Sequence, residues 1–208
     1  MKRLIGCAAL FGTLLVSACG GAGNAPATGG ANAAAAAQSF NLPSPSVLDA
    51  GETAAAAYCT QTKGEVLVRE PLYGTNGSSP LRLAGHRSFC QYTSKKDGSR
   101  IHILLETLYT TQPSLAALAY YLKPPTGSCQ GNPASCYCSY LGGSDQFGGD
   151  TGNGGGWYNK KSVDQVLEAC IFPDMSSIDS WGLAYHANGI VRGIDLEKVM
   201  RYKYPSKK

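Results

Sequence analysis

The sequence predicts an α+β fold, built from small disulfide-stapled modules of helix plus antiparallel strands, in two tandem divergent copies. Three observations support this prediction. Stretches with an apolar stripe at helical spacing alternate with short runs rich in β-branched and aromatic residues. Six of the eight cysteines follow the N-terminal region, an even number that is typical of disulfide-bonded exported domains. Two cysteine pairs, Cys59/Cys90 and Cys138/Cys170, recur at nearly the same separation.

The first copy is expected to begin with a helix. Thr53 is a good N-cap residue and Gly64 a good terminator, which predicts a helix over 54–63. Pro113 suits the first turn of a later helix that runs to Leu122. Between the two helices, β-prone runs predict strands over 65–69, 88–93 and 100–109.

The second copy repeats this order. Asn132 is a good N-cap, Pro133 suits the first helical position, and Gly142-Gly143 can end the helix. One apolar face of that helix carries Ala134, Tyr137, Cys138 and Leu141. Strands are expected over 157–158 and 166–172.

A last helix is expected to follow a capping box. Ser176 and Asp179 have the S-x-x-D spacing of that motif. Trp181 and Tyr185 lie one helical turn apart behind it, so their side chains are expected to pack together. Trp181 and the inward-facing Tyr137 are therefore predicted to be structural residues.

The cysteine spacing predicts the disulfide pairing. Six cysteines allow fifteen pairings. The matched separations favour Cys59–Cys90 and Cys138–Cys170, one closing each copy. A local Cys129–Cys136 bridge remains, and Cys136 lies on the opposite helix face from Cys138. The alternative is that some of these residues are free core cysteines.

The N-terminus has the order of an export signal. Lys2 and Arg3 are followed by an apolar run over 4–16 that is too short to span a bilayer. Leu15-Val16-Ser17-Ala18 then leads directly into Cys19. This pattern resembles the signal of bacterial lipoproteins. The alternative is an ordinary secreted protein that is cleaved nearby.

The lipoprotein resemblance implies that residues 1–18 are a signal peptide, removed together with Cys7, and that Cys19 receives the lipid. Two or more acyl chains anchor a protein stably. Gly20 follows the cysteine where an aspartate would favour inner-membrane retention, so the resemblance implies the outer membrane.

Composition divides the remainder of the chain. Residues 19–46 lack the apolar content to fold and read as a flexible Gly/Ala/Pro tether. The first module is expected over 47–125 and the second over 126–208. Loss of Lys2 and Arg3 lowers the basic count from 18 to 16 against 14 acidic residues, so the net charge is about +2. So small a charge does not indicate nucleic-acid binding.

The second module carries a family resemblance. Its motifs are Asn132-Pro133-Ala134-Ser135-Cys136-Tyr137-Cys138, Gly142-Gly143, Cys170-Ile171-Phe172-Pro173-Asp174 and Trp181. They resemble a small bacterial domain family of unknown function that bears a haemolysin label. Two family cysteines are absent, at Ile178 and near Asn188, and their joint absence implies that Cys138 and Cys170 pair together. The resemblance implies no catalytic residue.

No motif for catalysis or metal binding is found. His86, His102 and His186 lack metal-ligand spacing and are expected on the surface or on strand faces. We therefore expect no catalytic residue, no metal site and no cofactor. The glycine-rich segment 143–156 is expected to be a mobile loop and not a calcium site.

The expected function is that of an outer-membrane lipoprotein whose non-catalytic ectodomain binds an envelope protein or polymer, or supports envelope structure. The lipid on Cys19 makes the membrane contact. One alternative is an inhibitor of an extracellular hydrolase, with 73–80 or 143–156 as its exposed loop. A lytic factor is a further alternative, suggested only by the haemolysin label. The basic C-terminus from Lys198 is expected to be a solvated tail.

Overall fold

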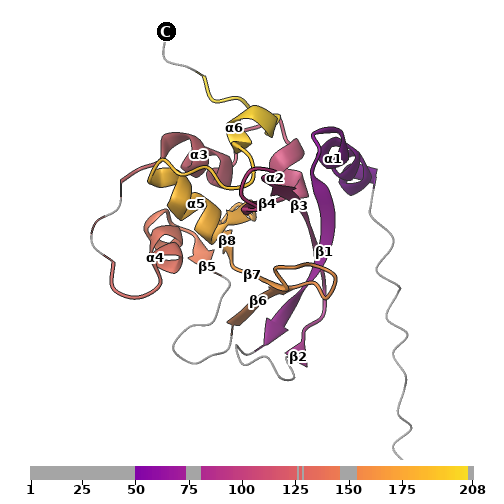
Figure 1. The fold of residues 1–208 in the computed structure, drawn as a ribbon, viewed down its shortest axis with the longest axis horizontal. Helices are drawn as coiled ribbons and strands as arrows, with labels where there is room; N and C mark the ends of the chain where they lie inside the picture. Colours follow the sequence, from indigo (N-terminus) through magenta and orange to yellow (C-terminus); the bar gives the residue numbers. More distant parts are fainter. Residues whose placement is uncertain (1–49, 74–80, 126, 128, 146–153, 206–208) are drawn as a thin grey trace, which may run out of the picture. The chain divides into compact units, whose positions relative to one another are not determined.

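A computed structural model of the chain describes residues 50–73, 81–125, 127, 129–145 and 154–205 (Figure 1). These residues belong to one compact unit, 43–208. The predicted signal peptide and tether and the predicted lipidation site Cys19 lie outside the described residues. Most of the two loops suggested for an inhibitor, 74–80 and 146–153, lies outside them as well.

One antiparallel sheet organises the described residues. Its strands are β1 (Glu65–Tyr73), β2 (Leu81–Arg82), β3 (Arg87–Thr93), β4 (Arg100–Leu104), β5 (Ser144–Asp145), β6 (Gly154–Tyr158), β7 (Val166–Leu167), β8 (Ala169–Ile171) and β9 (Ser177–Asp179). Their order across the sheet is β5-β8-β9-β4-β3-β1-β6-β7, and β2 pairs with the end of β1. The predicted α+β class is confirmed, because helices and antiparallel strands share one unit.

The helices of the described residues are α1 (Ala50–Gln61), α2 (Leu105–Tyr109), α3 (Leu115–Leu122), α4 (Pro133–Tyr140), α5 (Ser180–Ala187) and α6 (Leu196–Val199). As predicted, Asn132 caps α4, and its side chain accepts a hydrogen bond from the Ala134 amide at 2.9 Å. The α3 helix begins two residues after Pro113, with Ser114 as its N-cap. None of the helices in the described ranges is both long and apolar enough to span a bilayer.

Two predicted elements are wrong in kind. The expected strand over 100–109 ends at Leu104, and α2 follows, because Leu105 and Leu108 bury one helical face three residues apart. The expected capping box does not form: Ser176 lies directly before strand β9, and within β9 Ile178 pairs with Ile103 of β4. Asp179 itself is the N-cap of α5, accepting from the Gly182 amide at 2.8 Å.

The C-terminal segment is docked and not a solvated tail up to Tyr204. Leu196, Val199 and Met200 are buried in the main core. The Lys203 ammonium donates to the Glu197 carbonyl at 2.7 Å, and so closes the end of α6. The prediction failed because Val199 and Met200, which lie between Lys198 and Lys203, bury their apolar side chains and hold the segment against the core.

The two faces of the sheet are covered differently. On one face, helices bury an apolar core around Cys90, Ile103 and Ile178. On the other face, the β6–β7 hairpin covers a smaller apolar cluster that includes Phe89 and Trp157. Because side chains alternate across a strand, the same strands also direct several polar side chains toward the hairpin.

The structure contains the three disulfides that the sequence analysis predicts: Cys59–Cys90, Cys129–Cys136 and Cys138–Cys170. Their Cα–Cα distances are 5.7, 6.0 and 5.5 Å, which are ordinary for disulfides. The first and third tie a helix to the sheet, from α1 to β3 and from α4 to β8. The second bridge links exposed Cys129 to the half-buried Cys136 on α4.

We call residues 50–109 half 1 and residues 133–187 half 2. The sheet register relates them, because Cys90 pairs with Ile103, Ile103 with Ile178, and Ile178 with Cys170. Read across the sheet, the row is cysteine, isoleucine, isoleucine, cysteine, and it is therefore palindromic. Beyond it, β6 of half 2 pairs with β1 of half 1, so both halves contribute to a single sheet.

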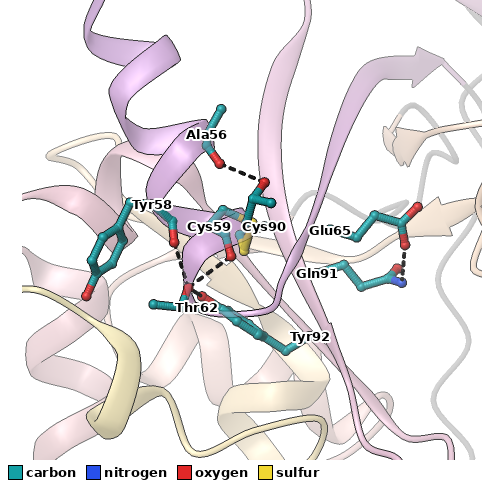
Figure 2. The surroundings of a disulfide bond; sticks show 9 residues. Ala56, Tyr58, Cys59, Thr62, Glu65, Cys90, Gln91 and Tyr92 are labelled. Atoms are coloured by element: carbon teal, nitrogen blue, oxygen red, sulfur yellow. Dashed lines mark hydrogen bonds between the residues drawn. A yellow bond between two sulfur atoms is a disulfide. The ribbon is translucent and has the colours of Figure 1, made fainter.

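A glycine lies against the disulfide in each half. A Cβ on Gly64 would come within 2.8 Å of the Cys59 sulfur, and closer still to the sulfur of Cys90. A Cβ on Gly143 would come within 2.9 Å of the Cys138 sulfur. Figure 2 shows the surroundings of the half 1 disulfide, where the Thr62 hydroxyl donates to the Tyr58 carbonyl at 2.9 Å.

Candidate functional site

A buried arginine occupies the hairpin-covered face of the sheet. Arg69 on β1 is fully buried. Its guanidinium donates to the carbonyls of Trp157 (3.1 Å) and Asp164 (3.0 Å) and to the Ser162 hydroxyl (3.1 Å). Burial lowers the pKa of the Arg69 guanidinium to about 10, which keeps the side chain charged at neutral pH. Arg69 therefore fastens the β6–β7 hairpin to β1.

His102 on β4 lies between this arginine and a carboxylate. The His102 side chain is buried, with Nδ1 at 3.0 Å from Asp179 Oδ2. Since an ionised carboxylate only accepts, Nδ1–H donates to Asp179. His102 Nε2 lies 3.2 Å from Arg69 and 2.9 Å from the Gln91 amide oxygen. Both ring nitrogens therefore face protein groups, and neither faces a nucleophile.

A second set of polar residues gathers near the start of α5. The Glu168 carboxylate accepts from the Asn132 amide at 3.3 Å. Burial, followed by the Asp145 charge, raises the pKa of Glu168. Asp145 in turn accepts from the Ser135 and Ser180 hydroxyls. Half 2 thus carries several carboxylates whose oxygens already have hydrogen-bond donors.

Two adjoining hollows open beside this polar region. One has a volume of about 330 Å³ and is lined by residues that include His102, Glu168 and Asp179. The other, of about 480 Å³, is lined by Ser99, Trp181, Tyr185, Ile190 and Arg192. Trp181 and Arg192 line both hollows. We call the two hollows together the Trp181 groove.

Aromatic and cationic groups form one wall of the Trp181 groove. The Trp181 and Tyr185 rings have centroids 5.8 Å apart and are tilted by 33°. The Arg192 guanidinium carbon lies 5.3 Å from the Tyr185 ring centroid. Tyr185 and Ile190 are exposed, and Trp181 is half-buried. The wall therefore offers ring faces, an apolar side chain and a cation to solvent.

The structure places the residues that the sequence analysis singled out in different surroundings. Tyr137 is buried, as expected of a structural residue. Trp181 packs on Tyr185, as expected, but it also lines the groove and is not wholly structural. His86 is exposed and His102 lies on a strand, as expected, whereas His186 is buried on helix α5.

Sequence reasoning missed the Trp181 groove and the buried polar cluster of Arg69, His102 and Asp179, which we call the Arg69 cluster. The sequence signs of this cluster are weak: Arg69 ends the apolar run 66–68, and His102 lies between Ile101 and Ile103 in a β-prone run. Polar residues that alternate with apolar ones in a strand usually face solvent. The β6–β7 hairpin, which is far from Arg69 and His102 in sequence, covers them and reverses that expectation. The groove likewise joins segments that begin at Ser99 and end at Arg192.

Comparisons of the chain with protein-family models, with curated proteins and with solved structures gave no match. The groove must therefore be interpreted from its own geometry. Its carboxylates are engaged: Asp164 pairs with Arg100 at 3.1 Å, and Asp179 pairs with His102. A groove of this composition can bind a ligand through ring faces and hydrogen bonds.

Proposed function

We propose that this protein is a lipid-anchored envelope lipoprotein whose ectodomain binds a carbohydrate polymer of the cell envelope without catalysis. The Trp181 groove is the observation that carries the proposal. Sugar rings present C–H faces that pack on the electron-rich faces of aromatic rings. Their hydroxyl groups exchange hydrogen bonds with carboxylates, hydroxyls and guanidinium groups. The groove supplies both kinds of contact, from Trp181 and Tyr185 and from Ser99, Glu168 and Arg192.

The absence of catalysis in this proposal rests on the polar contacts of the groove. A general base needs a ring nitrogen or carboxylate oxygen within reach of the substrate proton. Both nitrogens of His102 face protein groups. The Asn132 amide already donates to Glu168, and Arg100 already pairs with Asp164. In this proposal the remaining lone pairs of the two carboxylates accept hydrogen bonds from sugar hydroxyls and take no proton from the ligand. These groups are arranged to hold the hairpin and α5 in place.

A binding experiment tests the groove. The full-length protein, purified in detergent, is sedimented with insoluble peptidoglycan sacculi, which expose a glycan polymer. Tyr185→Ala and Arg192→Ala should each reduce the bound fraction several-fold. Tyr140→Ala is the matched control, because Tyr140 is an exposed tyrosine on α4 that does not line either hollow of the groove. Equal binding by all four proteins would rule out the groove as the site, and a failure of the wild type to bind would rule out this polymer.

A second experiment tests the anchor that the N-terminal motif implies. Cells that produce the wild type and Cys19→Ser are labelled with a fatty acid. Only the wild type should carry label, because the cysteine sulfur is the attachment atom, and Cys19→Ser should remain precursor-like or be released from membranes. Equal labelling of the two proteins would end the lipoprotein proposal while leaving the groove proposal intact.

We also propose that the two halves are divergent copies of one module, of which half 2 is the copy that resembles the haemolysin-labelled family. The equal spacing of five residues between cysteine and glycine, from Cys59 to Gly64 and from Cys138 to Gly143, supports this relation. The palindromic row through Ile103 and Ile178 supports it as well.

A further inference from the structure

A buried histidine lies beside two carboxylates near the C-terminus. His186 on α5, Asp195 and Glu197 each offer a ligand atom, and these three atoms lie within 4.8 Å of one another. Asp195 and Glu197 belong to the cap and first turn of α6. This cluster shares no residue with the Trp181 groove.

Neither ring nitrogen of His186 has a hydrogen-bond partner, although the His186 side chain is only 5% exposed. Its Nε2 lies 3.5 Å from Glu197 Oε1, which is too long for a good hydrogen bond. A buried polar group without a partner costs about 1–3 kcal/mol. Such a group therefore requires an explanation, and a ligand that binds the nitrogen would supply one.

The surrounding residues hold the three groups in position. The His186 ring stacks on Tyr120, with centroids 3.7 Å apart and planes within 8°. The Tyr120 hydroxyl accepts from the Leu196 amide at 3.2 Å, between the two acidic residues in sequence. Asp195 caps α6 by accepting from the Glu197 amide through Oδ1, and a carboxylate has a second oxygen to offer. Tyr120 thus positions both the ring and the acidic segment.

We propose that His186, Asp195 and Glu197 bind a divalent first-row transition ion, with Zn²⁺ as the best fit. Zn²⁺ accepts one imidazole nitrogen with carboxylate oxygens, at about 2.0–2.2 Å from each. Three protein ligands leave a fourth position for water. The donor atoms would have to move closer together than 4.8 Å, and the half-exposed side chains of Asp195 and Glu197 have more room to rotate toward His186 than buried ones would.

Lys123 competes with the ion for one ligand. Its ammonium lies 2.9 Å from Glu197 Oε1, and its side chain is 38% exposed. Metal binding would displace this ammonium into solvent. The second nitrogen of His186 also lacks the partner that usually orients a ligating histidine, and loss of such partners weakens metal sites by about 10–100-fold. We therefore expect micromolar affinity, well below that of a closed structural zinc site.

Calorimetric titration of Zn²⁺ into the untagged full-length protein, stripped with EDTA, tests the site. One equivalent should bind, and the melting temperature should rise with Zn²⁺ concentration because the ion binds only the folded state. Glu197→Gln and Asp195→Asn should each weaken binding by about tenfold or more, since each removes a charged ligand while keeping the side-chain shape. Lys123→Met should tighten binding, since it removes the competing cation.

Two controls make the result decisive. His86→Ala removes an exposed histidine outside the cluster and should bind Zn²⁺ like the wild type. Mg²⁺ should bind far more weakly than Zn²⁺, because it prefers oxygen ligands and retains its water.

His186→Ala removes the stacking on Tyr120, so circular dichroism must first show that it folds. No binding by the wild type, or unchanged affinity in both Glu197→Gln and Asp195→Asn, would overturn the proposal.

Discussion

In half 1, the residue that precedes helix α2 is Leu104, which makes no side-chain cap. In half 2, the matched residue before α5 is Asp179, which caps the helix and binds His102. Two residues further along each helix, the halves differ again. Glu106 is exposed in half 1, whereas Trp181 lines the groove in half 2. The shared positions hold a disulfide, a glycine and an isoleucine, whereas the differing positions carry the polar and aromatic chemistry. The comparison teaches that both halves carry a disulfide, a glycine and an isoleucine in matching places, whereas half 2 supplies the rings Trp181 and Tyr185 of the groove. Ser99 and His102 of half 1, and Ile190 and Arg192 beyond half 2, also belong to the lining.

The comparison is tested most severely by Asp179→Leu, which gives half 2 the residue of half 1. We expect the free energy of unfolding to fall by about 3–5 kcal/mol, because His102 loses its partner beside the buried Arg69 charge. Urea unfolding followed by circular dichroism measures the change. Asp179→Asn, which keeps the helix cap, should cost less. An Asp179→Leu variant as stable as the wild type would show that the contacts among Arg69, His102 and Asp179 do not hold the two halves together.

Removal of each long disulfide tests whether the two frameworks are equivalent. The two loops span 31 and 32 residues, so loss of either bridge should cost a similar amount, about 3–4 kcal/mol, in the chain-entropy account. Paired cysteine-to-alanine variants, compared by urea unfolding, measure this. Loss of Cys129–Cys136, whose loop spans 7 residues, should cost less, about 2 kcal/mol. If loss of the two long bridges lowers the free energy of unfolding by very different amounts, the frameworks of the two halves are not equivalent.

Substitution of the two matched glycines provides a finer test. Gly64→Ala and Gly143→Ala each place a methyl group against a disulfide, and overpacking of this kind costs about 1–3 kcal/mol. Gly127→Ala is the control, since a Cβ there meets nothing within 4 Å. Thermal unfolding of the three variants separates the cases. If the alanine substitution leaves the melting temperature unchanged at only one of the two glycines, the two halves pack differently around their disulfide sulfurs.

The smallest expected effect concerns pH and belongs to half 2 alone. Because the pKa of Glu168 is raised in the folded state, the folded protein holds this proton more tightly than the unfolded chain does. Its contribution to the free energy of unfolding is therefore full below the ordinary pKa and falls as pH rises through the raised value. Glu168→Gln removes the titrating group, so the free energy of unfolding should depend less on pH in this range. Identical pH profiles for the wild type and Glu168→Gln, measured by urea unfolding, would contradict the assignment.

Much of the framework could be predicted from local sequence. The Asn132-Pro133 start of α4 uses a side chain that caps its own helix, so no distant contact is needed. The cysteine pairing followed from spacing, because repeated separations reflect a repeated unit. The change from strand to helix at Leu105 could not be predicted in this way, since an apolar run fits either element until its packing partners are known.

What the sequence by itself determined about this protein is the class of fold, the disulfide pairing and the motif around Cys19. Each of these rests on residues close in sequence or on a spacing that occurs twice. Only the tertiary structure decided where the chemistry lies, because burial and distance depend on segments that are remote in sequence. Arg69 and His102 are buried because the β6–β7 hairpin covers them. His186 faces Asp195 and Glu197 only because the chain after α5 returns to its side, and no spacing motif records that return.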